Sequence, residues 1–171
     1  MSRNNIVRLL VLLPLITVAT ILAYRIVHAA TYYDQYVMVG AEGYNPLDMK
    51  LTGVYSQIKF AYNEEQNKFL LDYTNARNWR YEARWCITCY ANILDTKTTL
   101  TDHELYDRAM WEMGSYNVHY TGYNEITIKT TETVDYLWVD YWVYIDGKGK
   151  FGPGGEISLL PIVIEFVLEL R

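Results

Sequence analysis

The segment TVDYLWVDYWVYI, Thr133–Ile145, decides the fold class of this chain. It is built mainly from β-branched and aromatic residues, which fit a pleated sheet surface better than a helix. Asp135 and Asp140 fall on opposite faces of an extended strand, so we expect both faces to be partly covered and partly wet. The segment therefore predicts a β-strand in a mainly β protein.

The residues on either side of this segment repeat the same period of two. Upstream, Gly53–Thr74 alternates apolar and polar residues around the polar turn NEEQN, which is typical of a β-hairpin. Downstream, Asp146–Gly155 (DGKGKFGPGG) opens with the hairpin dipeptide Asp-Gly. Leu159–Arg171 alternates like a strand, with a terminal helix as the alternative. Further strands are expected over Trp79–Ile87, Tyr116–Tyr120 and Glu125–Thr131.

One segment predicts a helix. Thr101-Asp102-His103-Glu104 matches a capping box, in which the first residue is the N-cap and the fourth bonds back to it. Leu105, Ala109 and Met113 follow at helical spacing, and a glycine ends the pattern. We therefore predict a β-sandwich or jelly roll over 47–171, with one short α-helix near 102–113.

The composition excludes several classes of protein. Hydrophobic residues make up 51% of the 171 residues and aromatic residues 15%, too many for an intrinsically disordered chain. Charged residues make up 20%, too many for a polytopic membrane protein. The formal net charge is −5, so no nucleic acid is expected as a partner.

The N-terminus has the pattern of an export signal. Residues 1–8 contain Arg3 and Arg8 and no acidic residue, and the apolar run Leu9–Tyr24 follows them. Val27 and Ala29 then occupy the −3 and −1 positions of a cleavage site. We predict a signal peptide over 1–29, with a retained signal anchor as the alternative, although the run is shorter than the roughly 20 residues that cross a bilayer. The remainder is expected to be secreted or at the cell surface, and to meet a membrane only through an uncleaved N-terminal segment.

Residues 30–46 predict an extended arm. TYYDQYVMVGAEG, Thr31–Gly43, is β-prone and is followed by Asn45-Pro46. Such an arm can add as a strand to the sheet of a neighbouring copy, and repetition of this head-to-tail contact generates a filament. The alternative is that the arm pairs within its own domain. The residues expected to make the assembly contact are Tyr32, Tyr33, Tyr36, Val37 and Val39.

An export signal, an extended arm, a β-sandwich and the apolar terminal strand SLLPIVIEF together resemble the small secreted fibre subunits of archaea, of the cannula and bundling-pilus type. The resemblance covers the export signal and the C-terminal residues 158–171. It implies a jelly-roll subunit that donates its N-terminal strand, with calcium at the interfaces as an option. We therefore predict an exported, non-enzymatic structural subunit whose partner is itself, in a homopolymer assembled by donor-strand complementation.

The two cysteines form the motif Trp85-Cys86-Ile87-Thr88-Cys89, which leaves three interpretations. A structural disulfide, within the chain or between subunits, suits an exported domain. The W-C-x-x-C pattern also resembles the active site of thioredoxin-like oxidoreductases, which implies that Cys86 attacks and Cys89 resolves. A membrane-anchored thiol–disulfide oxidoreductase is therefore the alternative function. The third interpretation, metal binding with His103 and His119, does not match zinc-finger spacing.

Acidic residues elsewhere in the chain are weaker candidates for a calcium site or a catalytic carboxylate pair. No EF-hand-type loop occurs, so any calcium would be held by scattered carboxylates. Those on predicted loops are Glu64, Glu65, Asp146 and Glu156, and solvated surface charge is the alternative for each. Asp102 and Glu104 could form a carboxylate pair, but are better explained as charges in a first helical turn.

An aromatic strand face gives the last functional alternative. Tyr136, Trp138, Trp142 and Tyr144 share one face of the Thr133–Ile145 strand, as in modules that bind carbohydrate. Such a face is also typical of a sheet-to-sheet core or a subunit interface. A surface binding module is therefore kept beside the filament subunit and the oxidoreductase.

Overall fold

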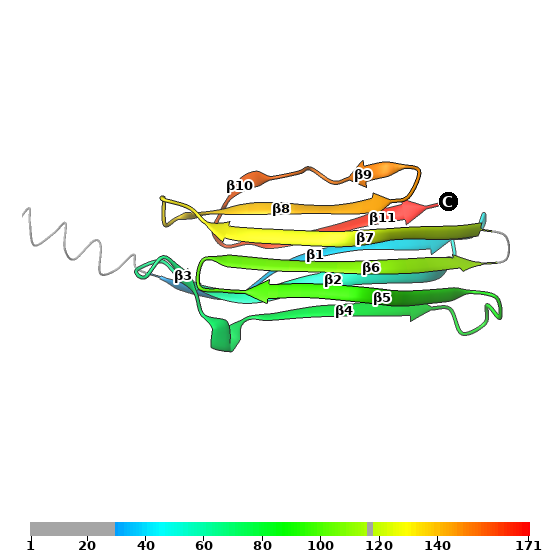
Figure 1. The fold of residues 1–171 in the computed structure, drawn as a ribbon, viewed down its shortest axis with the longest axis horizontal. Coiled ribbons are helices and arrows are strands. Elements are labelled where there is room, and N and C mark those ends of the chain that lie inside the picture. Colours follow the sequence, from blue (N-terminus) through cyan, green and yellow to red (C-terminus); the bar gives the residue numbers. More distant parts are fainter. Residues whose placement is uncertain (1–29, 116–117) are drawn as a thin grey trace, which may run out of the picture. The chain divides into compact units, whose positions relative to one another are not determined.

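Two β-sheets make up the unit Tyr32–Arg171 of the computed structural model, which describes residues 30–115 and 118–171. One sheet has the strand order β11-β1-β2-β3, with β4 also paired to β2, and the other has the order β10-β8-β7-β6-β5, with β9 paired to β8 (Figure 1). The mainly β, sandwich-like architecture is confirmed. The bounds are β1 Thr31–Tyr44, β2 Lys50–Asn63, β3 Lys68–Phe69, the 3₁₀ turn η1 Leu71–Tyr73, β4 Asn75–Glu82, β5 Tyr90–Leu100, β6 Glu104–Ser115, β7 Val118–Thr130, β8 Tyr136–Ile145, β9 Gly149–Phe151, β10 Glu156–Leu159 and β11 Val163–Leu170.

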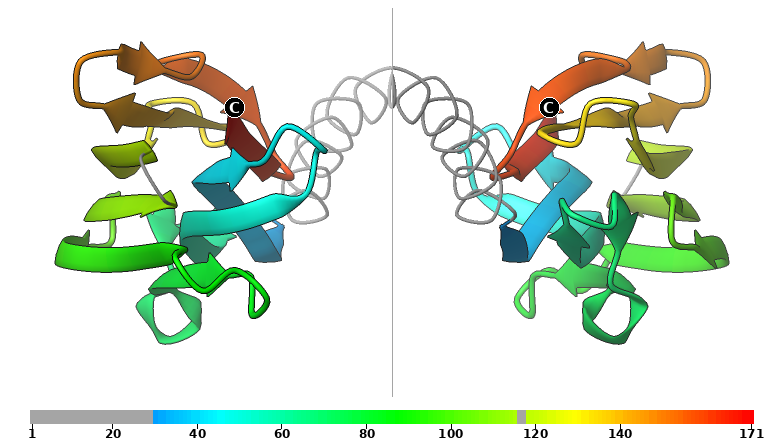
Figure 2. Two further views of the ribbon diagram at one scale, coloured as in Figure 1. Left: turned by 90° about the vertical axis from the view of Figure 1, so that its right-hand side faces the viewer. Right: turned by 90° about the vertical axis from the view of Figure 1, so that its left-hand side faces the viewer.

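Strands β5 to β8 form an antiparallel meander on one side of the unit, and β1, β2 and β11 lie across from them (Figure 2). The predicted strand Thr133–Ile145 is β8, which begins three residues later, at Tyr136. Its residues alternate, with Leu137, Val139 and Val143 fully buried between the sheets. The predicted signal segment over 1–29 lies outside the described residues.

The helix predicted near 102–113 is wrong, because this stretch is the central strand β6. The side chain of Thr101 does accept a bond from the backbone N–H of Glu104, at 2.9 Å. The backbone N–H of Thr101, however, donates to Glu104 O and closes a tight hairpin turn between β5 and β6. Leu105, Ala109 and Met113 are four residues apart, a spacing that fits a helix and also one face of a strand. Within the described residues, η1 is the helical element.

The core has two apolar clusters separated by a polar layer. One cluster gathers around Val37, Phe60 and Ile128, and the other around Val54, Trp111 and Val143. Between them along β2, β6 and β7 lie Ser56, Asp107 and Asn124, all fully buried. The polar layer therefore marks the middle of the sandwich and divides the unit into two halves along its strands.

Candidate functional site

Strand β1 lies in the middle of its sheet, between β11 and β2. It pairs with β11 in parallel, from Tyr36 opposite Val163 to Gly43 opposite Leu170. Val37, Val39 and Ala41 point into the sandwich and are fully buried. The segment predicted as an assembly arm thus forms part of its own domain's core in this structure.

The five predicted assembly residues fall into two groups. Val37 and Val39 belong to the first core cluster, and Tyr32 packs against that cluster. Tyr33 is exposed and meets the ring of Tyr73 edge-on, while the hydroxyl of Tyr36 donates to Glu165 of β11. Asp34, between Tyr33 and Tyr36, adopts a positive φ of 58°. This interrupts the alternation of inward and outward side chains along β1.

The outer face of β1 is fitted closely to β2. A Cβ atom at Gly40 would lie 2.6 Å from Cδ1 of Tyr55 and 2.9 Å from the backbone oxygen of Val54. The Tyr55 ring lies flat against the strand, and Trp79 of β4 stacks on it with centroids 5.2 Å apart. A strand with a side chain at the position of Gly40 would therefore not fit here without displacing Tyr55.

A small polar network joins the end of β1 to β2. Burial alone would raise the pKa of Glu42, but hydrogen bonds from Lys50, Tyr44 and Tyr55 outweigh it and lower this pKa. The bond to Glu42 raises the pKa of Tyr44 to about 12, and burial together with the bond to Glu42 raises the pKa of Tyr55. Because Lys50 and Tyr55 of β2 both donate to Glu42 of β1, the network fixes the register of β1 at its C-terminal end.

One short turn connects β1 to the rest of the domain. The side-chain oxygen of Asn45 accepts the backbone N–H groups of Leu47 and Met49, at 3.0 and 2.9 Å. Asp48 adopts a positive φ of 57°, and its carboxylate forms a 2.6 Å ion pair with Arg171 at the C-terminus. Residues 45–49 are therefore the hinge through which β1 would have to move if it left its place.

The two cysteines lie in the connection between β4 and β5, residues 83–89, which we call the disulfide loop. Cys86 and Cys89 are joined by a disulfide, and two successive turns allow residues three apart to meet. The base of the loop is clamped by Arg80, which donates to Ala91 O at 2.8 Å, and by Glu82, which accepts from Ala91 N at 2.9 Å. Strand β5 follows Cys89 directly, so the motif lies in a turn between two strands rather than at the start of a helix.

The histidines proposed for metal binding are far apart in the fold. His119 of β7 contacts Tyr90, next to the disulfide loop, whereas His103 lies in the turn at the other end of β5. Glu64 and Glu65 lie in the β2–β3 turn, and Asp146 follows β8 at the opposite end of the strands. Among residues 30–115 and 118–171, no three His, Cys, Asp or Glu side chains come together as a metal site.

The remaining carboxylates also have local roles. Glu104 pairs with Lys129 of β7 at 3.2 Å, and the backbone oxygen of Asp102 accepts the N–H of Phe69. Glu156 begins β10, where its charge contributes to the raised pKa of Tyr141, although burial is the larger cause. The predicted pair Asp102 and Glu104 therefore belongs to a hairpin turn.

The four predicted aromatic residues share the outer face of β8, but neighbouring side chains cover them to different extents. Trp142 is buried under Lys150, whose Nζ lies 3.4 Å from its ring centroid, and Tyr144 stacks on Tyr123 of β7 at 4.9 Å. Tyr136 and Trp138, at the start of the strand, stay 37% and 39% exposed. The covered half cannot stack on a ligand without displacing a lysine, whereas the uncovered half can.

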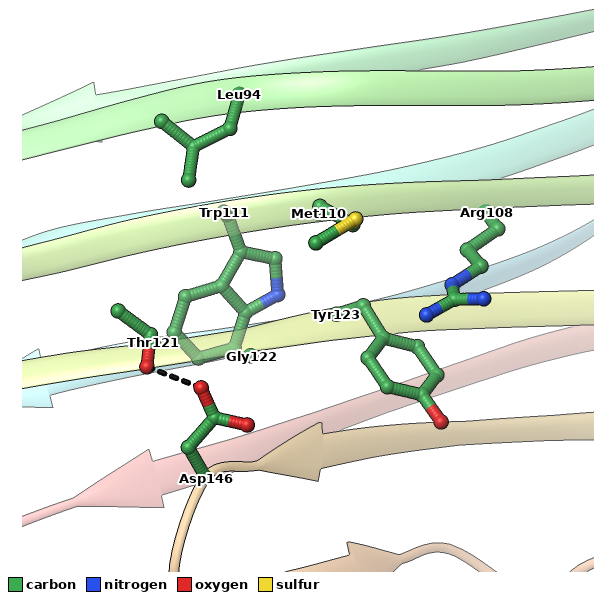
Figure 3. A pocket seen from close by; sticks show the side chains of 8 residues that line it. All are labelled: Leu94, Arg108, Met110, Trp111, Thr121, Gly122, Tyr123 and Asp146. Carbon is green, nitrogen blue, oxygen red and sulfur yellow. Dashed lines mark hydrogen bonds between the residues drawn. The ribbon is translucent and has the colours of Figure 1, made fainter.

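A shallow pocket of about 180 Å³ opens on the same sheet, beside the covered half (Figure 3). The Arg108 guanidinium lies over Tyr123, 3.9 Å from its centroid, and Thr121 donates to Asp146. Both polar groups are therefore engaged with neighbouring side chains. The full lining is Leu94, Arg108, Met110, Trp111, Thr121, Gly122, Tyr123 and Asp146.

Comparison with known proteins gives no relative. No family model matches the chain, and neither the curated proteins nor the solved structures include a match. In the described part of the chain, no helix has the length and apolar character to span a membrane. The function is therefore argued from the strands and loops themselves.

Proposed function

We propose that this chain is an exported, non-enzymatic structural subunit that assembles into an extracellular filament by donating strand β1 to a neighbouring copy. In the assembled state, β1 of one subunit occupies the place between β11 and β2 of the next. The partner is a second copy of the same chain, and the polymer grows head to tail because each subunit both gives and accepts a strand.

The observation that carries this proposal is the position of β1. It is the first strand of the domain, it is central in its sheet, and the chain continues from it into the remainder through the 45–49 hinge. Its departure would open a groove that Val37, Val39 and Ala41 now fill completely. An open apolar groove of this kind is costly in water, which favours its occupation by another β1.

The closeness of the fit supports a second copy as the occupant. Gly40 passes under the ring of Tyr55 with no room for a side chain, and Glu42 accepts from both Lys50 and Tyr55 of β2. A strand from an unrelated protein would have to carry a glycine and a carboxylate at this same spacing. The chain's own β1 carries both, so the groove is selective for its own sequence.

Export is supported by the N-terminal sequence and by the disulfide. A basic start and an apolar run precede the domain, and Cys86–Cys89 is a bond that persists in oxidising compartments. The domain then follows cleavage after Ala29, with β1 starting two residues later, at Thr31. Calcium at the subunit interfaces stays part of the proposal as an option. The jelly-roll form implied by the fibre-subunit resemblance is kept as part of the same proposal.

A second candidate rests on the disulfide loop. A bonded Cys-x-x-Cys pair beside an exposed tryptophan is the arrangement that a thiol–disulfide oxidoreductase would use. It predicts insulin-reductase activity that is lost in Cys86→Ser. The hairpin setting of the loop favours a structural brace, because no helix start is present to stabilise a Cys86 thiolate.

The proposal is tested with purified protein that lacks residues 1–29. This protein is expected to form ordered polymers in electron micrographs, and the same protein without Thr31–Gly43 is expected to stay soluble and unpolymerised. Adding a peptide of residues 31–44 to the shortened protein should restore its thermal stability, whereas a peptide with Gly40→Val should not. Monomeric behaviour of the longer protein would contradict the proposal.

A further inference from the structure

The strand registers define two ends of the unit. The disulfide loop precedes Tyr90, the first residue of β5, and Leu100 at the other end of β5 pairs with Leu105 of β6. Lys129 pairs with Glu104 of β6 and with Trp138 of β8, so β8 begins where β5 ends. The disulfide loop and the start of β8 therefore lie at opposite ends of the strands (Figure 1).

The end at which β8 begins, which we call the acidic end, is rich in carboxylates. Its turns are held together by bonds from Phe69 N to Asp102 O and from Asn67 Nδ2 to Thr131 O. Burial raises the pKa of Tyr62 to about 12, and the charges of Glu64 and Asp135 contribute. In the described turns of this end, Lys68 is accompanied by Glu64, Glu65, Asp72, Asp102, Glu132 and Asp135.

The opposite end lacks this excess of carboxylates. Its loops carry Arg84 and Lys148, which are exposed, and Arg171, which is paired with Asp48 and Glu169. Asp146 is the other carboxylate of these described loops and accepts from Thr121. The unit is therefore electrically polar along its strands, and two copies placed head to tail bring unlike charges together.

Exposed apolar side chains accompany the charges at both ends. In the disulfide loop, Ile87 is 99% exposed and Trp85 is 58% exposed. The disulfide between Cys86 and Cys89 braces the loop that carries these two side chains. Beside the acidic end, Ile157 and Leu159 of β10 are 64% and 60% exposed. They pair in register with Trp138 and Tyr136 of β8, which are also exposed. This four-residue group, with Glu156 of β10 and Glu132 and Asp135 of the β7–β8 loop around it, is named the β8–β10 patch.

We propose that the disulfide loop of one copy docks on the β8–β10 patch of the next copy, with Arg84 against the patch carboxylates and Trp85 and Ile87 against its apolar side chains. The inference rests on the proposed function and adds a second contact to the same head-to-tail polymer. A tryptophan and an isoleucine on a covalently braced loop lose little conformational freedom on binding, which is the property of an interface anchor. The role of the disulfide is then to hold this anchor rather than to exchange electrons.

The charge pairing is tested by reversal in the polymer-forming protein that lacks residues 1–29. Arg84→Glu alone, and Glu132→Lys with Asp135→Lys alone, are each expected to raise the concentration needed for assembly about tenfold. An equal mixture of the two variants should assemble like the wild type, because each then offers the other a complementary end. The triple variant Arg84→Glu, Glu132→Lys, Asp135→Lys should also assemble by itself. Failure of both the mixture and the triple variant would overturn the inference.

The apolar contact has a matched control. Ile87→Ser is expected to raise the assembly concentration about tenfold, measured by sedimentation. Leu94→Ser removes an apolar side chain of comparable size, 56% exposed on the β5 face, and should change nothing. Equal effects of the two changes, or none from Ile87→Ser, would overturn the docking.

The two proposals can fail separately. If the loop and patch variants leave assembly unchanged while loss of β1 abolishes it, strand donation stands and the docking is wrong. If charge reversal controls association but loss of β1 does not, the docking stands and strand donation is wrong. If wild-type protein without residues 1–29 does not associate at all in sedimentation, both are wrong.

Discussion

Strands β1 and β6 hold similar positions in their sheets but are fixed there in different ways. Each lies between two neighbours and buries every second side chain over its central part. β6 pairs antiparallel with β5 and β7 along its whole length, whereas β1 pairs in parallel with β11, from the far end of the sequence. β6 is thus built into a continuous meander, whereas β1 is the first described strand and pairs with β11, the last one.

The buried faces of the two strands also differ. Asp107 of β6 bonds to Thr98 of β5 and to Asn78 of β4, while the Trp111 indole donates to Asn124 of β7 at 3.0 Å. The central part of β1 buries the apolar side chains Val37, Val39 and Ala41, and the buried amide of Gln35 before them accepts a bond from the backbone N–H of Ile162. Polar bonds fix β6 to particular partners, but apolar side chains fit any groove of the right shape. Under the proposed function, this difference makes β1 rather than β6 the strand that a neighbour would supply.

The largest expected effect is on β6. Trp111→Ala should lower the free energy of unfolding by about 3–5 kcal/mol, because it removes a fully buried side chain and leaves a cavity. The loss is measured by urea denaturation of the protein that lacks residues 1–29. Trp138→Ala, at a partly exposed tryptophan of β8, serves as the control and should cost less than about 1 kcal/mol. Equal losses of stability in the two variants would contradict the view that β6 is held more firmly than the outer face of β8.

The next effect concerns the fit of β1. Gly40→Val should destabilise the docked strand by about 1–3 kcal/mol, because its side chain would overlap Tyr55 and the backbone of β2. Met38→Val, two residues away on the same strand and half-buried, is the matched control and should be close to neutral. Thermal denaturation compares the two, and a Gly40→Val protein as stable as the control would contradict the close fit.

A pH dependence is expected from the polar layer beneath β6. Burial raises the pKa of Asp107, and the hydrogen bonds from Thr98 and Asn78 oppose this only in part. Asp107 Oδ2 and Asn78 Oδ1 have no partner within the described residues, and a proton on the carboxyl group would add the donor that a carboxylate lacks. On the strand packed beside it, Arg80 is turned to Ala91 and Asn92, with Glu82 next to it.

The sign of this dependence follows from the raised pKa. The stability that protonated Asp107 contributes is complete below the carboxyl pKa of the unfolded chain and is lost as the pH rises through the folded value. Asp107→Asn retains a donor and should remove this part of the pH profile, measured by urea denaturation between pH 4 and 8. An unchanged profile in the variant would contradict the assignment.

The smallest effect is expected at the β1–β2 turn. Tyr55→Phe removes one of three hydrogen-bond donors to Glu42 and should cost about 0.5–1.5 kcal/mol. Because the pKa of Glu42 is lowered, the stability from its network is present above the unfolded carboxyl pKa and is lost as the pH falls through the folded value. Tyr33→Phe, at an exposed ring, is the control and should leave the unfolding midpoint in place. A larger loss for Tyr33→Phe than for Tyr55→Phe would contradict this account.

Much of the fold could be predicted from period-two patterns. Thr133–Ile145 leads to β8 because its β-branched and aromatic residues fit a sheet, and Gly53–Thr74 leads to the β2–β3 hairpin, although the expected second strand is shortened to Lys68–Phe69 and followed by η1. The stretch after Thr101 misled, because residues four apart satisfy both periods and the turn sequence matches a helix cap. The alternation of Leu105, Asp107, Ala109 and Trp111 was the available signal, and it was hidden by a buried aspartate.

The candidate site was less predictable, because it depends on contacts between distant segments. The β-prone arm gives a strand, but the parallel pairing of β1 with β11 joins residues more than a hundred positions apart. The role of Gly40 under Tyr55 and the cover of Trp142 by Lys150 likewise depend on how neighbouring strands register. Local sequence determines which residues form strands, and packing determines which of them a partner can reach.

Strand donation is tested most directly by a cross-link between β1 and β11. Met38 and Glu165 are register partners on the outer face, and neighbouring strands lie within the distance that a disulfide spans. Protein without residues 1–29 that carries Met38→Cys and Glu165→Cys is assembled, oxidised and run on a non-reducing denaturing gel, with each single-cysteine variant as a control. Donation of β1 predicts a ladder of covalently joined subunits that collapses on reduction. A single monomer band with both new cysteines consumed would contradict it.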